Sequence, residues 1–377
     1  MDLSDYRDQL DEIDHKMVDL FEERLEVCRQ AAASKLQDVR PVHDGEGEEG
    51  RLDVLESLVA NARDKKAMRE LFTQILAISR RIQYEVFAEY GRRYDQGFQK
   101  VDVLPLPDGQ LRVVYPGVEG SYSHGAALQY FGDGAKIYPV LTFENAMREV
   151  QEGWADYGLL PIENSSAGTV VDNYDLLLKY HNYIVAETFL PVSHALLAVQ
   201  DAKLEGIQTV FSHPQGLMQS SDFLNAHKEW RQVSLVNTAV AAKKVLEDGD
   251  PTQAAVASEI AGKLYGLKVL KSSIQNNQNN TTRFVILSSR PVYREDANKV
   301  SICFELPHRS GSLYNMLGHF IFNGVNMVRI ESRPIPGRNW EYRFFIDLEG
   351  SLQDAGLRNA LDGISAEAGN FWIFGNY

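Results

Sequence analysis

Two clusters of polar residues, each next to an apolar segment, are the residues in this sequence most suited to binding a ligand or catalysing a reaction. Residues 161–168 read Pro-Ile-Glu-Asn-Ser-Ser-Ala-Gly and follow Leu159 and Leu160, whereas residues 281–284 read Thr-Thr-Arg-Phe and precede Val285. Polar residues at strand ends of an α/β fold line clefts that bind ligands. We therefore expect the two clusters to contribute to one cleft, although the first could also be only a hydrogen-bonded loop.

Two further polar turns lie between predicted strands and helices. Residues 115–124 (Tyr-Pro-Gly-Val-Glu-Gly-Ser-Tyr-Ser-His) place glycines and hydroxyl groups where a strand gives way to a helix, a context that favours anion binding. The segment lacks the GxGxxG spacing of a dinucleotide site. Residues 212–219 (Ser-His-Pro-Gln-Gly-Leu-Met-Gln) follow a predicted strand at 209–211. His213 is a conventional acid, but a histidine before a proline in a turn is also a common structural residue.

The N-terminal segment carries basic residues on a long predicted helix. Apolar residues recur at steps of three and four without Gly or Pro before Pro41, which predicts a helix of roughly 35 residues and about 50 Å. Arg24 and Lys35 share one face of this helix, whereas Arg7 is rotated by about 100° from Arg24. One helix cannot easily direct all three to one point, but a second copy could supply Arg7. The alternative is that all three are solvent-exposed face residues.

Composition limits the class of protein. The 377 residues carry a net charge of −14, which argues against nucleic acid as a partner. Cys28 and Cys303 lie far apart in apolar segments and are expected to be buried free thiols. The acidic N-terminus does not resemble a signal peptide, and no apolar run is long enough to span a membrane. We therefore expect a cytoplasmic protein.

Changes in pattern along the chain predict three domains. The first is all-helical, with its later helices expected near 51–63 and 65–91 after a glycine-containing loop. The second alternates strands and helices, and the third has the order βαββαβ of a ferredoxin-like α+β sandwich. The predicted segments are a helical domain at 1–91, a linker at 92–110, an α/β domain at 111–290 and the α+β domain at 298–377.

The PIENS-type segment and the Thr-Arg-Phe triplet, with the turns at 115–124 and 212–219, resemble the prephenate dehydratase family. The resemblance implies two α/β lobes like those of a periplasmic binding protein, with the site between them. It implies that Thr282 acts on the departing hydroxyl of prephenate, supported by Glu163 and Asn164, and that Arg283 binds a carboxylate. Further substrate-binding residues implied are Ser121, Ser123, Ser165, Thr169, Gln215, Gln219 and Phe284.

The N-terminal segment is similar to AroQ-type chorismate mutases, which are interlocked helical dimers. The resemblance implies that Lys35 and Gln83 donate to the ether oxygen of chorismate, and that Arg7 acts in the partner subunit's site. One departure from the family is that Gly47 stands where an arginine is expected before Glu48, so either Arg51 takes over its role or that carboxylate contact is absent. The substrate-binding residues implied are Arg7, Arg24, Asp44, Glu48, Arg51 and Ser79.

The third segment is similar to ACT regulatory domains, which bind phenylalanine at a dimer interface. Gly-Ser-Leu after the first strand and Glu-Ser-Arg-Pro after the second carry the similarity, and Glu331 with Arg333 could instead be an edge-strand ion pair. The effector-binding residues implied are Gly311, Ser312, Leu313, Glu331 and Ser332.

Together the resemblances cover nearly the whole chain and imply a bifunctional chorismate mutase/prephenate dehydratase. Such an enzyme converts chorismate to prephenate, and prephenate to phenylpyruvate, water and carbon dioxide, under feedback inhibition by L-phenylalanine. We expect no cofactor, no metal and a homodimer or higher homo-oligomer. The alternatives are a monofunctional dehydratase with a non-catalytic helical dimerisation domain, and a solute-binding protein fused to helices. The lack of a signal peptide and the ACT-like segment argue against the second.

Overall fold

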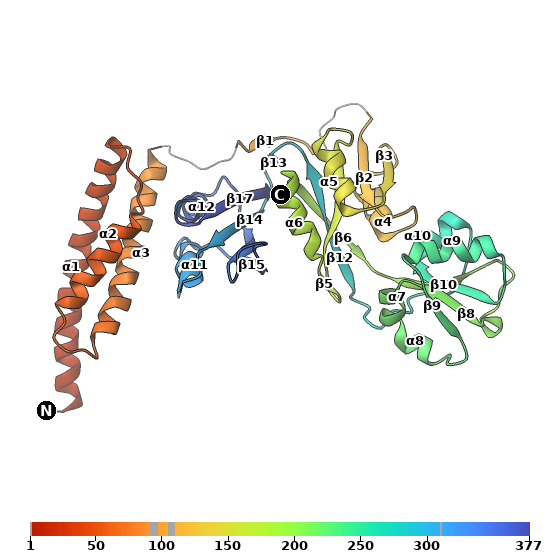
Figure 1. Ribbon diagram of the computed structural model, residues 1–377, viewed down its shortest axis with the longest axis horizontal. Helices are drawn as coiled ribbons and strands as arrows, with labels where there is room; N and C mark the ends of the chain where they lie inside the picture. Colours follow the sequence, from red (N-terminus) through yellow and green to blue (C-terminus); the bar gives the residue numbers. More distant parts are fainter. Residues whose placement is uncertain (1, 91–96, 105–109, 310) are drawn as a thin grey trace. The chain divides into compact units, whose positions relative to one another are not determined.

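A computed structural model describes residues 2–90, 97–104, 110–309 and 311–377 (Figure 1). The chain forms two compact units: Met1–Gln96 with Asn298–Ile373, and Gly97–Ala297 with Phe374–Tyr377. No helix within the described ranges is long and apolar enough to cross a membrane.

Three helices open the first unit: α1 (Leu3–Gln37), α2 (Gly45–Ser57) and α3 (Lys65–Glu89). The long first helix is confirmed, and a capping box between Asp2 and Asp5 fixes its start. The prediction that the second helix begins near residue 51, after a glycine loop, is wrong. Asp44 caps α2 by accepting from the backbone N–H of Gly47 at 3.0 Å, and acidic residues in the first turn favour the helix dipole. The Asp44 cap and the acidic first turn, together with packing of the helix, outweigh the cost of about 1 kcal/mol for each helical glycine.

The rest of the first unit has the predicted βαββαβ order. Its strands form a sheet in the order β15-β16-β14-β17, which is the ferredoxin-like arrangement. The elements are β14 (Lys299–Leu306), α11 (Ser312–Phe322), β15 (Met327–Pro334), β16 (Tyr342–Glu349), α12 (Ala355–Glu367) and β17 (Asn370–Asn376).

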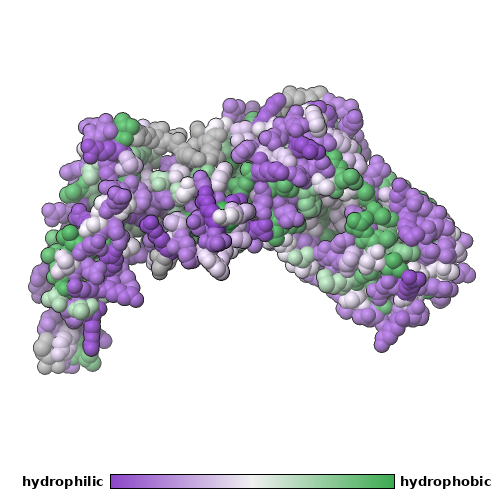
Figure 2. Space-filling model, in the orientation of Figure 1, coloured by the Kyte–Doolittle hydropathy of each residue, from purple (hydrophilic) through white to green (hydrophobic). Residues whose placement is uncertain are grey.

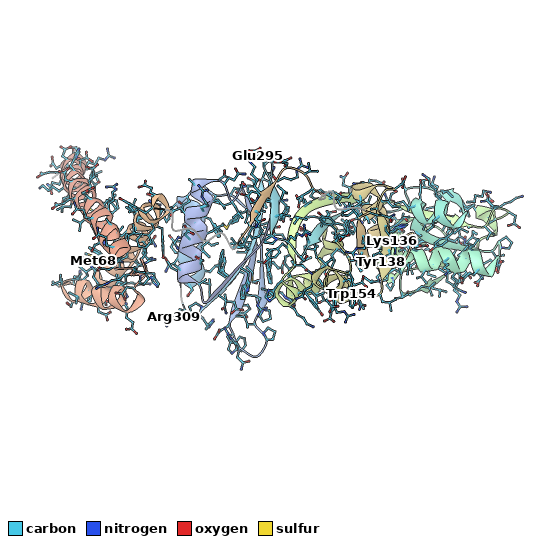
Figure 3. All side chains as sticks on the ribbon, turned by 90° about the horizontal axis from the view of Figure 1, so that it is seen from above. Met68, Lys136, Tyr138, Trp154, Glu295 and Arg309 are labelled. Atoms are coloured by element: carbon cyan, nitrogen blue, oxygen red, sulfur yellow. The ribbon has the colours of Figure 1, made fainter. Side chains whose placement is uncertain are left out.

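The second unit contains two α/β lobes. The first lobe has a sheet of order β6-β12-β4-β2-β3, and Lys136 and Tyr138 mark its edge strand β3 (Figure 3). Tyr115, Leu159 and Phe284 pack in its core. Its elements are β2 (Arg112–Pro116), α4 (Tyr122–Phe131), β3 (Lys136–Val140), α5 (Phe143–Gln151), β4 (Tyr157–Asn164), β5 (Gly168–Thr169), α6 (Val171–Tyr180), β6 (Tyr183–Pro191) and β12 (Thr281–Ser288).

The second lobe is inserted between β6 and β12. Its sheet has the order β11-β7-β10-β8-β9, with alanine-rich helices packed on it. Its elements are β7 (His194–Ala198), η1 (Leu204–Gly206), β8 (Thr209–Ser212), α7 (Pro214–Gln219), α8 (Ser221–Asn225), β9 (Arg231–Ser234), α9 (Thr238–Asp248), β10 (Gln253–Ser258), α10 (Glu259–Tyr265) and β11 (Lys268–Lys271).

The predicted linker at 92–110 is only partly described, because residues 92–96 and 105–109 lie outside the described ranges. The described part contains a short strand, β1 (Gln99–Val101), which pairs in parallel with β13 (Val292–Arg294) of the same unit. At least this stretch is therefore built into the fold.

Candidate active sites

A cleft of about 570 Å³ opens between the two α/β lobes. The first lobe contributes the end of β4, the start of β12 and the starts of α4 and α6, and the second contributes β7, α7 and the start of α9. The polar side chains that line it are Tyr122, Ser123, Asn164, Thr169, Asp172, His194, His213, Gln215, Gln219, Asn237, Thr238 and Thr282. The two polar clusters of the sequence thus contribute to one cleft.

Thr282 and Asn164 form the centre of the first lobe's contribution. They are register partners in the β4–β12 ladder, and Asn164 Nδ2 donates to Thr282 Oγ1 at 2.9 Å. Asn164 Oδ1 in turn accepts from the backbone N–H groups of Ser166 and Ala167, which fixes the amide orientation. Because the threonine oxygen already accepts a hydrogen bond, its O–H is available to donate into the cleft.

Arg283 and Glu163 do not line this cleft, so the prediction that they act there alongside Thr282 needs correction. Successive side chains of a strand point to opposite faces, and Arg283 therefore lies on the side of β12 away from Thr282. Its Nε pairs with Glu187 at 2.7 Å, and its guanidinium donates to the hydroxyl of Tyr377 at 2.8 Å. Glu163 is 3.9 Å from the same guanidinium. This cluster lies on the face of the sheet opposite Thr282.

Helix N-termini bring partial positive charge to the cleft. Among the described residues that line it, none is lysine or arginine. The starts of α4, α6 and α9 all contribute lining residues, and each places the positive end of a helix dipole at the cleft. The arrangement suits an anionic ligand.

A buried chain of side chains at the floor of the cleft was not predicted from the sequence. His194 is 2 % exposed, and its Nδ1 hydrogen-bonds to the Tyr122 hydroxyl while its Nε2 hydrogen-bonds to Gln219, each at 2.9 Å. Burial lowers the pKa of His194 below its ordinary value, so the imidazole is neutral near pH 7. A single histidine at the start of an apolar strand gave no signal of this role.

The remaining predicted residues of this cleft divide into two groups. Ser121 caps α4 by accepting from the His124 N–H, and Ser165 accepts from the Thr281 N–H at 2.9 Å, so both support the backbone outside the cleft lining. The predicted residues that do line it are Ser123, Thr169, Gln215, Gln219 and Phe284.

A second pocket, of about 350 Å³, lies among α1, α2 and α3 in the first unit. Lys35 Nζ donates to the carbonyl of Val42 at 2.7 Å, and Arg24 donates to the hydroxyl of Ser79. Gln83 is buried, and its Oε1 has no hydrogen-bond partner within the described part of the chain. The predicted residues that line this pocket are Arg24, Lys35, Asp44, Glu48, Arg51, Ser79 and Gln83.

Two cations in this pocket lie close together. Burial lowers the pKa of Arg24, and the neighbouring charge of Arg51 lowers it further, although an arginine remains protonated at any physiological pH.

Arg51 lies within α2 and does not open it, contrary to the expectation from the sequence. A Cβ atom at Gly47 would come within 2.4 Å of the Asp44 carboxylate, so a larger residue there would displace the helix cap. Arg7 is exposed on α1, about 25 Å along the axis from Arg24, and does not line the pocket.

If this pocket binds chorismate, as the family resemblance implies, the Arg51→Ala variant should raise the chorismate KM about tenfold with a smaller change in kcat, the pattern seen when ground-state binding is lost. Gly47 has no side chain that could carry a positive charge, and Arg51 is the cationic residue of α2 that lines the pocket. Steady-state kinetics with chorismate measures the change, with Arg63→Ala, outside the pocket lining, as the control. An unchanged KM would show that Arg51 does not compensate for Gly47.

The predicted effector residues fall into two places. Gly311, at φ +84°, precedes α11, and Ser312 and Leu313 line a small pocket of about 120 Å³ with Trp340. Glu331 and Ser332 lie on β15, which contributes none of the described residues that line that pocket, and Glu331 lies 3.5 Å from Arg329. One chain does not bring the two groups together. Among the described residues, no cluster of His, Cys, Asp and Glu could hold a metal ion.

Two family models match the segments that contain the two pockets. Residues 113–292 match the prephenate dehydratase family, and residues 6–84 match chorismate mutase type II. The bifunctional chorismate mutase/prephenate dehydratase of Enterobacter agglomerans is 31% identical over 98% of this chain and 94% of its own length. 

Two solved structures share the fold of much of the chain. One, described as GqqA, a novel type of quorum quenching acylases, is 32% identical with a TM-score of 0.65, covering 70% of this chain and 96% of its own. The other is a prephenate dehydratase from Arthrobacter aurescens in complex with L-Phe, which is 29% identical with a TM-score of 0.66, covering 70% of this chain and 89% of its own. With two family matches and near full-length similarity, this chain belongs to the bifunctional chorismate mutase/prephenate dehydratase family.

Proposed function

We propose that the two activities of this family reside in the two sites described above. The pocket among α1–α3 rearranges chorismate to prephenate, and the cleft between the lobes converts prephenate to phenylpyruvate, water and carbon dioxide. The observation that carries this division is that each site gathers residues of the matched family segment within one compact unit.

The mutase step needs positioning and charge stabilisation. The rearrangement of chorismate is pericyclic and requires no nucleophile or general base, so the enzyme must hold a compact conformer and stabilise charge on the ether oxygen. Arg24 and Arg51 are suited to the substrate carboxylates. Lys35 uses one of its three donors on the Val42 carbonyl, and the remaining donors can reach a ligand together with the amide of Gln83.

The dehydratase step needs a donor for the departing hydroxyl and a held carboxylate. Aromatisation of the ring drives the loss of water and carbon dioxide. The Thr282 hydroxyl, oriented by Asn164, donates to the leaving group, while the helix N-termini of α4, α6 and α9 bind the two carboxylates. Neutral His194 and Tyr122 support Gln219 at the floor.

A second copy of the chain completes the mutase unit in this proposal. Apolar side chains along the first half of α1 are exposed at alternating steps of three and four residues, the spacing of a helix–helix seam. Figure 2 shows apolar surface among the helices of this region. Arg7 lies on the same half of α1, so a partner helix laid along it could bring the partner subunit's Arg7 to the pocket. The exposed apolar residues are Leu3, Tyr6, Leu10, Ile13, Met17 and Leu20.

The assignment of both activities is tested by one time course. The purified protein is supplied with chorismate, and phenylpyruvate is followed by its ultraviolet absorbance in alkali. We expect phenylpyruvate to form from chorismate and from prephenate. Conversion of prephenate alone would assign α1–α3 to a dimerisation domain without catalysis.

The C-terminal βαββαβ segment is proposed to be an ACT-type regulatory domain that binds phenylalanine and inhibits the dehydratase. The phenylalanine-bound state of the Arthrobacter structure supports this proposal. Backbone N–H groups after Gly311, at the start of α11, suit the effector carboxylate.

We expect Gly311→Ala to raise the phenylalanine concentration for half-inhibition about tenfold, because a Cβ at positive φ costs about 1–2 kcal/mol and shifts these N–H groups. Uninhibited dehydratase turnover should stay normal. Gly324→Ala is the matched control, since Gly324 has φ +66° near the other end of α11, and neither glycine has an atom within 4 Å of its added Cβ. Equal inhibition curves for the two variants would contradict the effector assignment.

A further inference from the structure

We propose that Arg80 is a positioning residue of the mutase pocket, held in place by Glu367 of the C-terminal segment, so that the ferredoxin-like domain helps to form the chorismate site. The inference rests on the proposed assignment of the α1–α3 pocket to chorismate. Neither the sequence motifs nor the family resemblance singles out Arg80, Glu367 or His319.

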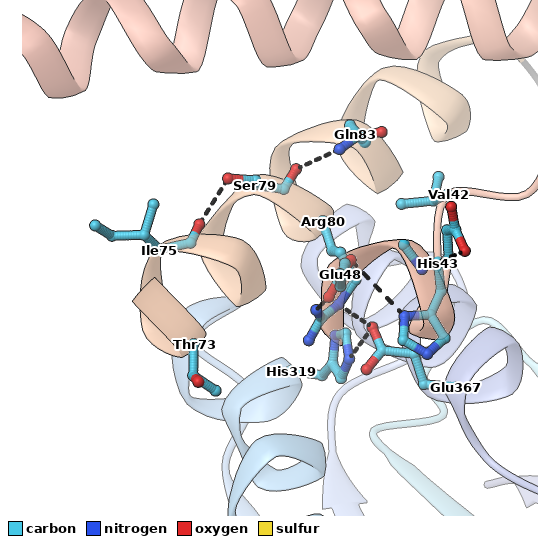
Figure 4. Close-up of polar contacts among 12 residues, drawn as sticks. Val42, His43, Glu48, Thr73, Ile75, Ser79, Arg80, Gln83, His319 and Glu367 are labelled. Carbon is cyan, nitrogen blue, oxygen red and sulfur yellow. Dashed lines mark hydrogen bonds and ion pairs between the residues drawn. The ribbon is translucent and has the colours of Figure 1, made fainter. Parts of the chain in front are cut away.

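Arg80 bridges two carboxylates that lie far apart in the sequence (Figure 4). Its guanidinium pairs with Glu48 on α2, and its Nε donates to Glu367 Oε1 at 2.8 Å. His319 Nε2, on α11, lies 3.2 Å from the same Glu367 oxygen. All four side chains belong to the first compact unit.

The bridge is almost removed from water. The side chains of Arg80, Glu367 and His319 are 9%, 8% and 7% exposed. Burial alone would raise the pKa of Glu367, but the hydrogen bond from His319 and the charge of Arg80 outweigh it, and the net pKa is lowered. Glu367 therefore stays ionised, and Arg80 stays charged between two anions. Removing one partner from such a group leaves a buried charge without compensation.

Glu48 connects this bridge to the substrate pocket. It lines the α1–α3 pocket beside Arg24, Arg51 and Gln83, and Arg80 lines the same pocket. A free glutamate on a surface helix would sample several rotamers, whereas a charge-assisted pair with a planar guanidinium holds the carboxylate in one orientation. Glu367 of the C-terminal segment in turn holds the Arg80 guanidinium in place.

The local packing is built for this contact. A Cβ atom at Gly363 on α12 would come within 2.4 Å of His319 Nδ1, so the glycine allows the imidazole to lie against α12 and reach Glu367. The ring of Tyr84, one helical turn after Arg80, meets the His319 ring edge-on at 6.1 Å. The neighbouring Arg81 also faces the C-terminal segment, over the Phe322 ring at 4.8 Å, but contacts neither carboxylate.

The test uses the full chain and the Glu367→Gln variant, which keeps the side-chain shape and removes the charge. We expect the chorismate KM to rise about tenfold with kcat changed by less than about threefold, because the orientation of a binding group is lost. Arg80→Lys should show the same rise in KM, since an ammonium group lacks the planar set of donors with which a guanidinium orients two carboxylates. Arg81→Lys is the matched control and should leave KM unchanged.

Three readouts decide the outcome. A normal chorismate KM in both Glu367→Gln and Arg80→Lys overturns the proposal, even if the melting temperature falls, because the bridge would then only hold the domains together. Dehydratase turnover with prephenate should be normal in all variants. Lys35→Ala serves as the reference for the pocket itself. If Lys35→Ala also leaves mutase activity unchanged, the assignment of the pocket to chorismate is wrong. If Lys35→Ala is the one variant that reduces mutase activity, the pocket assignment holds and the role of Arg80 is wrong.

Discussion

Replacing Thr282 by valine is expected to lower dehydratase turnover at least ~100-fold, the scale of losing one positioned donor at a reacting oxygen. Valine keeps the β-branched shape and the strand, and removes only the hydroxyl that Asn164 orients toward the cleft. The measurement is phenylpyruvate formation from prephenate at saturating substrate. The conversion of chorismate to prephenate should be unaffected, because that pocket belongs to the other unit.

Thr281→Val is the matched control for this experiment. Thr281 is the adjacent residue of β12, and its hydroxyl donates to the Asn279 carbonyl at 3.3 Å outside the cleft lining. Turnover in this variant should stay near normal. Equal turnover of the two variants, whether both high or both low, would exclude a specific role for the Thr282 hydroxyl.

Lys35→Ala is expected to lower the mutase kcat about 100-fold or more, because a preorganised cation at the ether oxygen acts mainly on the transition state. Lys35 is the lysine of the pocket, and its tether to the Val42 carbonyl sets its direction. Disappearance of chorismate is followed with and without prephenate present. Lys66→Ala, which removes an exposed lysine at the start of α3, should be silent.

The Thr282→Val and Lys35→Ala variants can also be combined in a complementation experiment. A mixture of Thr282→Val and Lys35→Ala proteins should convert chorismate to phenylpyruvate, because prephenate made by one can be consumed by the other. If the mixture makes no more phenylpyruvate than either protein alone, one of the two sites has been assigned to the wrong reaction.

The sequence predicted the order of elements well because periodicity and turn residues are local signals. The long α1, the alternation of the α/β segment and the βαββαβ order are all present. The start of α2 was missed because the cap by Asp44 overrides three glycines, and the balance depends on a side-chain orientation that composition does not reveal.

The sites were predicted less completely than the fold. Thr282 and Arg283 are adjacent in a recognisable triplet, yet strand alternation sends them to opposite faces, and only the surrounding sheet decides which face meets the cleft. His194 takes its role from burial between two side chains distant in sequence. Arg80 depends on a partner nearly three hundred residues away, and no local pattern distinguishes it from Arg81.

The second lobe joins the first through only two chain segments, 192–193 and 272–280, and the backbone N–H of Val192 donates to the Asn280 carbonyl at 2.8 Å where they run together. We infer that these two adjoining segments serve as a hinge between the lobes. Thr282 and Asn164 both belong to the sheet of the first lobe, so rotation about the hinge leaves their hydrogen bond intact. His213, Gln215 and the start of α9 belong to the second lobe. With the roles proposed above, closure about this hinge would carry these binding groups toward the Thr282 hydroxyl, and opening would release phenylpyruvate without breaking the Asn164–Thr282 hydrogen bond.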